Sequence, residues 1–248
     1  MATYRITVSY NGRDFDGWQR LKDSRKTIQG ILENAISDVL DCDIEVTASG
    51  RTDAGVHARA QVCSFSCTEA VDAARFTERV NSILPRTISV LDMEQVEDRF
   101  NARIHAVDKT YCYTIWNSNT NPGMYSDVAV AFGQKVQVEQ LQSVLNMFLG
   151  THDFNPFATR SSNKNTVRCI TKVQALEEGD LLKVYITGDG FLHNMVRNIV
   201  GVAMGCVMGH IDRDQIAEAL HDRNADIKGY KAPARGLCLW NVNYGQPK

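Results

Sequence analysis

Eight consecutive residues, Gly-Arg-Thr-Asp-Ala-Gly-Val-His at positions 50–57, combine side chains that could do chemistry. The single carboxylate, Asp53, lies between two glycines, with Arg51 two residues before it and His57 four residues after it. Glycine permits positive φ angles and close approach of another backbone, so we expect a tight loop that presents Asp53. A neighbouring guanidinium favours the ionised carboxylate, the form that a nucleophile or general base needs at neutral pH. The segment predicts an active-site loop, and a structural turn around Asp53 is the alternative.

A second candidate is a charged residue in an otherwise apolar stretch, Arg197 within residues 195–199. A charge without a partner is costly in an apolar environment, so a buried arginine is expected to pair with a carboxylate. Asp53 is the partner that we predict. Asp189, which is close in sequence, is the alternative, because buried arginines often serve structure alone.

The elements that must position these residues follow from hydrophobic periodicity. Strands are expected at residues 4–10, 60–66, 87–97, 111–116, 128–136, 173–176, 182–186 and 237–244, and helices at 28–40, 73–84, 141–149 and 191–208. Helices that alternate with hairpin-like strands favour an α+β, mixed α/β fold over a purely parallel sheet. We expect two similar α/β halves: residues 1–107, which carry the Asp53 loop, and residues 108–248, which carry Arg197.

Six blocks of residues, in order along nearly the whole chain, resemble the TruA family of tRNA pseudouridine synthases. The segment 50–57 is similar to the family's active-site motif, in which the Asp is the catalytic nucleophile. The other blocks are Tyr-Asn-Gly-Arg-Asp-Phe-Asp-Gly-Trp-Gln at 10–19, Phe-Asn-Ala-Arg at 100–103 followed by Lys-Thr-Tyr-Cys-Tyr at 109–113, Gly-Thr-His-Asp-Phe at 150–154 with Thr-Val-Arg-Cys-Ile at 166–170, Gly-Phe-Leu-His-Asn-Met-Val-Arg-Asn at 190–198, and Ala-Pro-Ala-Arg-Gly-Leu-Cys-Leu at 232–239. The resemblance implies two ferredoxin-like halves that share a continuous, mainly antiparallel sheet with a central active-site cleft.

The resemblance also implies a function, the isomerisation of uridine to pseudouridine in the anticodon stem-loop of tRNA, at positions 38–40. This reaction breaks the bond between ribose and a uracil nitrogen, turns the base and rejoins it through carbon, without a cofactor. Family members act as homodimers, with one tRNA contacting both subunits. Whether Asp53 attacks the sugar, attacks the base or abstracts a proton stays open at this point.

Further roles come from the same resemblance. Tyr111 matches an aromatic residue that stacks on the target nucleotide and assists proton removal, and stacking of a flipped base is worth about 1–3 kcal/mol. The alternative is that Tyr111 and Tyr113 share a strand face in the core. Arg51 matches an arginine that helps to extrude the base, and Arg197 matches one that contacts the catalytic Asp. Leu237 matches an apolar residue that lines the base pocket.

The formal net charge of −2 does not exclude RNA binding, because counterion release depends on the phosphates contacted locally. Residues 154–176 and 227–248 contain basic but no acidic side chains, and residues 20–26 contain four basic residues and one acid. Arg20, Lys164 and Arg168 are therefore candidate RNA contacts, and solvated faces sorted by chance are the alternative.

Two departures from the family pattern affect the expected RNA contacts and not the chemistry. The family often has a small residue where His105 stands and an arginine where Lys109 stands. Lysine keeps the charge but loses the bidentate fork of arginine, so substrate choice is expected to differ more readily than catalysis.

Composition narrows the class of protein. A chain of 248 residues, 44% of them hydrophobic, can bury a sizeable core. Seven cysteines without a CxxC pair favour reduced cytosolic thiols over a disulfide framework, and their separation from the six histidines argues against zinc. The first residues lack a signal-peptide pattern and no apolar run approaches bilayer length, so we expect a cytoplasmic protein that uses no metal and no membrane.

Three other functions stay open. The presence of Asp53, Tyr111 and Arg197 argues against an RNA-binding paralogue without catalysis. An unrelated hydrolase with Asp53 and His57 as an acid and base pair would leave the blocks around Tyr111 and Arg197 unexplained. The same isomerisation on ribosomal RNA or at another tRNA site is compatible with every residue named above.

Overall fold

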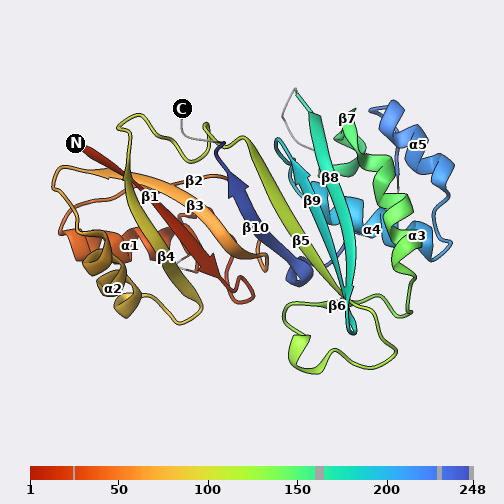
Figure 1. Ribbon diagram of the computed structural model, residues 1–248, viewed down its shortest axis with the longest axis horizontal. Coiled ribbons are helices and arrows are strands. Elements are labelled where there is room, and N and C mark those ends of the chain that lie inside the picture. The colour runs from red at the N-terminus through yellow and green to blue at the C-terminus, as the bar shows by residue number, and fades with distance from the viewer. Residues whose placement is uncertain (25, 160–164, 228–230, 246–248) are drawn as a thin grey trace. The chain divides into compact units, whose positions relative to one another are not determined.

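A computed structural model describes residues 1–24, 26–159, 165–227 and 231–245 (Figure 1). The chain forms two compact units, Met1–Val107 with Cys238–Lys248, and Asp108–Leu237. Each unit is a mixed α/β structure with mainly antiparallel strand pairing. Within the described residues, no helix is both long and apolar enough to cross a membrane.

The first unit is built from β1 (Ala2–Tyr10), α1 (Ile28–Leu40), β2 (Thr47–Ala48), β3 (His57–Cys67), α2 (Ala73–Ile83), β4 (Ile88–Val96) and, from Cys238 onward, β10 (Leu237–Asn243). Its strands follow the order β4-β1-β3-β10, and the short β2 also pairs with β3. β1 is antiparallel to both of its neighbours, with Ile6 opposite Cys63 on one side and Met93 on the other. β10 runs parallel to β3, with Cys238 opposite His57.

Apolar side chains alternate along β1, so one face of this sheet belongs to the hydrophobic core. Every second residue from Tyr4 to Tyr10 is at most 3% exposed, as expected for a strand with one buried face. The rings of Tyr4 and Phe65 stack 5.6 Å apart, and Phe65 stacks on Phe76 of α2 at 5.7 Å. Helix α2 therefore packs on the apolar face of β1 and β3.

The second unit is built from β5 (Asp108–Trp116), η1 (Gly123–Tyr125), β6 (Val130–Ala131), α3 (Val138–Leu145), η2 (Asn146–Phe148), β7 (Gly150–Asp153), η3 (Asn155–Phe157), β8 (Val167–Glu178), β9 (Leu181–Gly188), α4 (Met195–Val207), α5 (Arg213–His221) and η4 (Ala234–Gly236). The order β5-β9-β8-β7 is antiparallel throughout, and β6 pairs in parallel with β5. Helix α4 is buried on nearly every face, as its apolar sequence predicts.

The predicted mixed α/β class with mainly antiparallel pairing is confirmed. The joining of the two halves across one continuous sheet with a cleft stays a prediction, and so does the division into domains. The sequence-based division assigned residues 238–248 to the second half, whereas β10 pairs with β3 of the first unit.

Two predicted elements are shorter than expected. The strand expected at 128–136 is limited to Val130–Ala131. Gly133 turns the chain with a φ of +89°, and the side chain of Asn117 bonds both backbone groups of Val136 in place of a strand partner. The helix expected from residue 191 begins only at Met195, because Asn194 before it adopts a left-handed conformation.

Helix α5 was not predicted, although the sequence carries a signal for it. Asp212 and Gln215 form a capping box at its start, and Ile216, Ala219 and Leu220 follow at helical spacing and are buried.

Candidate active site

Asp53 opens a tight turn between β2 and β3. The backbone N–H of Val56 donates to the carbonyl of Asp53 at 3.1 Å, and Gly55 within the turn has a φ of +78°. Glycine takes this angle without the strain that a Cβ would cause, so the turn requires Gly55. Asp53 is half-buried and Arg51 is exposed, while Thr52 between them is buried. The turn therefore presents the carboxylate and the guanidinium at the surface of the first unit.

Thr52 anchors this turn to residues 10–19. Its hydroxyl shares a hydrogen bond of 2.8 Å with the hydroxyl of Tyr10. Its carbonyl accepts from the N–H of Trp18 at 3.0 Å. Both aromatic partners are at most 3% exposed. The first sequence block thus serves as a buried support for the Asp53 turn, a role that the sequence did not reveal for Tyr10, Thr52 or Trp18.

Gly12 and Gly17 let residues 10–19 approach the Asp53 turn closely. A Cβ on Gly12 would lie 1.9 Å from the carbonyl oxygen of Val56, and a Cβ on Gly17 would lie 2.9 Å from that of Thr52. Gly17 also has a φ of +94°. A larger residue at Gly12 would have to displace the backbone of the turn, so this glycine is fixed by close approach.

His57, at the start of β3, is 6% exposed. Its Nδ1 accepts a hydrogen bond of 3.0 Å from the N–H of Gly12. Through this bond, His57 ties the start of β3 to the residues that support the turn. The contact assigns His57 Nδ1 a structural role beside the Asp53 turn.

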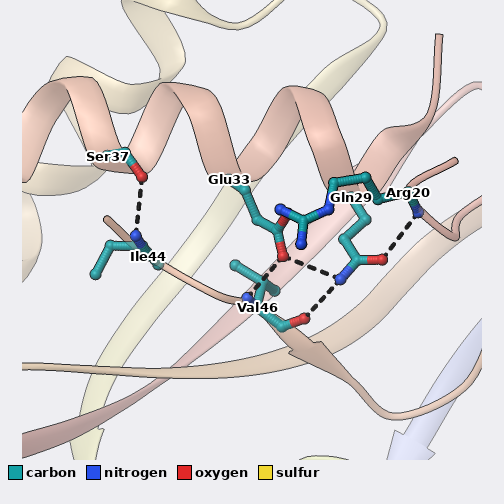
Figure 2. A network of polar contacts seen from close by, with 6 residues as sticks. All are labelled: Arg20, Gln29, Glu33, Ser37, Ile44 and Val46. Carbon is teal, nitrogen blue, oxygen red and sulfur yellow. Dashed lines mark hydrogen bonds and ion pairs between the residues drawn. The ribbon is translucent and has the colours of Figure 1, made fainter. Parts of the chain in front are cut away.

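A buried carboxylate, Glu33 of α1, holds the side chain of Arg20 (Figure 2). The Glu33 side chain is 3% exposed and that of Arg20 is 59% exposed, and Arg20 Nη1 donates to Glu33 Oε2 at 2.9 Å. Gln29 Nε2 and the N–H of Val46 both donate to Glu33 Oε1 at 3.0 Å. Three donors satisfy this carboxylate, as its burial requires. Arg20, a predicted RNA contact, is thus oriented from the protein side and exposed on the other.

In the second unit, the two tyrosines of β5 have different surroundings. Tyr111 is 8% exposed and meets the ring of Phe191 edge to face, with centroids 5.1 Å apart. Tyr113 is fully buried and donates its hydroxyl proton to the carbonyl of Pro233 at 2.9 Å. Burial raises the pKa of the Tyr113 hydroxyl well above its usual range. A Cβ on Gly236 would lie 2.6 Å from the Tyr113 ring, so Tyr113 is a core residue that requires glycine beside it.

Arg197, near the start of α4, is half-buried and not fully buried as the sequence suggested. Its Nε donates to the carbonyl of Ala232 at 2.7 Å, and its Nη1 donates to Asn194 Oδ1 at 2.9 Å. The N–H of Ala232 returns a bond to the carbonyl of Arg197 at 3.1 Å. Asp189, the alternative partner, accepts from the N–H of Cys169 at 3.0 Å. The contact between Arg197 and Asp53 stays a prediction.

Two of the remaining predicted residues, Arg168 and Leu237, lie at the starts of strands. Leu237 is 5% exposed at the start of β10. Arg168, on β8, is half-buried, and its Nη1 donates to the carbonyl of Val167 at 2.6 Å. Lys164 lies outside the described residues.

The structure groups the candidate residues within two units. The first unit holds Arg20, Arg51 and Asp53, and the second holds Tyr111, Arg168, Arg197 and Leu237. Across the described ranges, no three side chains of the His, Cys, Asp or Glu types lie close enough together to bind a metal ion.

Comparison with known proteins relates most of the chain to one family. A family model described as tRNA pseudouridine synthase matches residues 6–103 and 144–245. A Bacillus cereus protein named tRNA pseudouridine synthase A 2 is 37% identical over 246 residues, which are 98% of this chain and 100% of the relative. An Acetivibrio thermocellus protein named tRNA pseudouridine synthase A is 36% identical over 245 residues, with the same coverage of both chains. A solved Cbf5-Nop10-Gar1 complex contains a chain with a TM-score of 0.36 and 11% identity, over 81% of this chain and 44% of that chain.

The chain belongs to the tRNA pseudouridine synthase family. The prediction of an isomerase that acts on tRNA uridine is therefore confirmed.

Proposed function

We propose that this chain converts uridine to pseudouridine in the anticodon stem-loop of tRNA, at positions 38–40, with Asp53 as the nucleophile. The observation that carries the proposal is the support of the Asp53 turn. The turn is clamped by Tyr10, Gly12 and Trp18, and its carboxylate stays half-buried beside the exposed Arg51. A turn that is held by several buried contacts is expected where a reacting group must keep one position.

The reaction conserves atoms and electrons. The N1–C1′ bond of uridine breaks, the base turns, and a C5–C1′ bond forms while C5 loses a proton and N1 gains one. Attack of Asp53 on the sugar, attack on the base, or removal of a proton would each use an ionised carboxylate in a fixed position.

Other residues would hold the base and the nucleotide. The ring of Tyr111 is held against Phe191 and would replace the stacking that a flipped base loses. Leu237 would line the base pocket, and Arg197 would contact Asp53. Arg51 is exposed one residue before the anchored Thr52, a position that suits a side chain that enters the vacated stack.

Basic side chains around these residues would contact phosphates. Arg20 is 59% exposed and oriented by Glu33, and Arg168 is fixed at the start of β8. Lys164 belongs to the same proposal on sequence grounds. The functional form would be a homodimer in the cytoplasm, where tRNA is available and where the seven free cysteines would stay reduced.

The test is tritium release from 5-tritiated uridine in an unmodified tRNA transcript, followed by mapping of the product. Wild type should release tritium from the anticodon stem-loop, and Asp53→Ala should release none while it binds tRNA within severalfold of wild type. Asp92→Ala, which removes an exposed carboxylate from β4, is the matched control and should keep full turnover. Release by Asp53→Ala would remove Asp53 from the chemistry, and a product at another position would replace the proposed site.

A further inference from the structure

Asn194 has an unusual backbone conformation for a residue with a side chain. It precedes α4 with φ 62° and ψ 4°, in the left-handed region. Within the described part of the chain, only Asn194 and Asp41 combine a positive φ with a Cβ atom. This region is disfavoured by the Cβ, although Asn tolerates it better than most residues.

The side chain of Asn194 does not do what an Asn at a helix start normally does. At this position, the side-chain oxygen commonly accepts from a backbone N–H of the first turn, and Asn194 makes no such bond. Its Oδ1 accepts from Arg197 Nη1 at 2.9 Å, and its Nδ2 donates to Thr159 Oγ1 at 2.6 Å. The residue is 9% exposed, and both bonds are part-buried.

The bond from Asn194 constrains the orientation of the Arg197 guanidinium. One bond, from Nε to the carbonyl of Ala232, holds one edge of the planar group. A second bond from a different nitrogen, to Asn194, fixes the plane. Thr159 in turn fixes the amide of Asn194 by accepting from its other end.

We infer that Asn194 is a positioning residue that orients Arg197 for the reaction. The inference rests on the proposed function, in which Arg197 contacts the catalytic carboxylate. This role explains why the Asn194 side chain accepts a hydrogen bond from Arg197 and not from a backbone N–H of the first helical turn.

Three substitutions at position 194 separate the effect of the backbone conformation from the effect of the side-chain hydrogen bonds. Asn194→Gly keeps the left-handed turn and removes both amide bonds, so the protein should stay folded while kcat falls about tenfold to a hundredfold with little change in KM. Asn194→Asp keeps an acceptor for Arg197 and should restore most of kcat. Asn194→Ala removes both features and should lower kcat and the melting temperature together.

Asp41 provides the matched control. It also has a positive φ, 52°, but is exposed at the end of α1 in the first unit. Asp41→Gly and Asp41→Ala should leave kcat at the wild-type value, and only the alanine variant should lower the melting temperature.

A double-mutant cycle tests the coupling. If Asn194 acts through Arg197, Asn194→Gly should have no further effect on kcat in an Arg197→Gln background. A full additional loss, or an Asn194→Gly enzyme with wild-type kcat, would overturn the inference while wild-type turnover leaves the proposed function standing.

A readout independent of turnover is the hydrogen exchange of the Arg197 Nε–H, measured by NMR on the whole protein labelled with nitrogen-15. Exchange should be slow in wild type and in Asn194→Asp, and faster in Asn194→Gly. Equal exchange rates in wild type and Asn194→Gly would overturn the inference. If wild type formed no pseudouridine, the proposed function would fail and this measurement would still decide whether Asn194 orients Arg197.

Discussion

The Asp53 turn and the start of α4 are held by different means. The turn is fixed by steric approach, because Gly12 and Gly17 leave no room between one backbone and the next. The guanidinium of Arg197 is fixed by two hydrogen bonds from separate nitrogens. A site closed by steric approach tolerates no added atom, whereas a site held by hydrogen bonds tolerates a replacement that keeps the acceptor. The predictions below test this contrast.

The largest effect is expected from Gly12→Ala. The new Cβ would lie 1.9 Å from the Val56 carbonyl oxygen, so the Asp53 turn must move. We expect a loss of about 3 kcal/mol in unfolding free energy and of about a hundredfold in turnover, measured by urea unfolding and tritium release. Gly179→Ala is the control, since its φ of +63° is strained but no atom lies within 4 Å of the added Cβ. Losses as small for Gly12→Ala as for Gly179→Ala would contradict the inference that close approach at Gly12 fixes the turn.

Glu33→Ala tests whether side-chain bonds also support the first unit. It leaves the N–H of Val46 without its acceptor and removes one of the two acceptors of Gln29 Nε2, which should cost about 2 kcal/mol of unfolding free energy. Arg20→Ala should cost less than about 1 kcal/mol, because its guanidinium is mostly exposed. If both variants lost the same stability, the charge pair would matter more than the buried bonds.

Tyr113→Phe tests the core beside the candidate base-stacking residue. It removes the bond to the Pro233 carbonyl and should cost about 1 kcal/mol at neutral pH. Burial raises the pKa of this hydroxyl, so the folded protein keeps a proton that the unfolded chain loses above about pH 10. The unfolding free energy of wild type should therefore fall as pH rises above about 10, and the fall should be shallower in Tyr113→Phe. Parallel pH curves would show that the hydroxyl is not shielded as the structure indicates.

The smallest effect is expected from Arg168→Ala, which removes one proposed phosphate contact. The slope of log affinity against log salt concentration should decrease in magnitude by about 1, with turnover at saturating tRNA unchanged. Lys183→Ala is the control, because Lys183 pairs with Glu178 and has no assigned role in RNA binding. An unchanged salt slope for Arg168→Ala would place the RNA elsewhere on the second unit.

The sequence predicted most of what depends on local pattern. The alternation of β1 and the apolar length of α4 identified core elements, and the glycines around Asp53 identified the turn. Contacts between distant segments could not be read in this way. The support of Thr52 by Tyr10 joins residues 42 positions apart, and no local pattern encodes such a pairing.

The partners of Arg197 at the start of α4 could not be read from local pattern either. The sequence indicated that Arg197 needs a partner but not that Asn194 and Ala232 would supply bonds. The helix begins after the left-handed Asn194, whose side chain bonds Thr159, 35 positions away, and the apolar pattern that predicted an earlier start carries no sign of this contact.

Because β10 belongs mostly to the first unit but follows the second unit in the chain, the first unit can be completed only after the second has been synthesised. β3, which starts at His57 directly after the Asp53 turn, has β10 as its parallel neighbour on one side. All of the second unit is translated between residue 107 and this strand. A nascent chain released before residue 237 would therefore lack the strand that pairs with His57 and Ala58, and the start of β3 would have an unpaired edge on that side. We expect such a fragment to aggregate more readily than the full chain, because unpaired strand edges can pair with other chains.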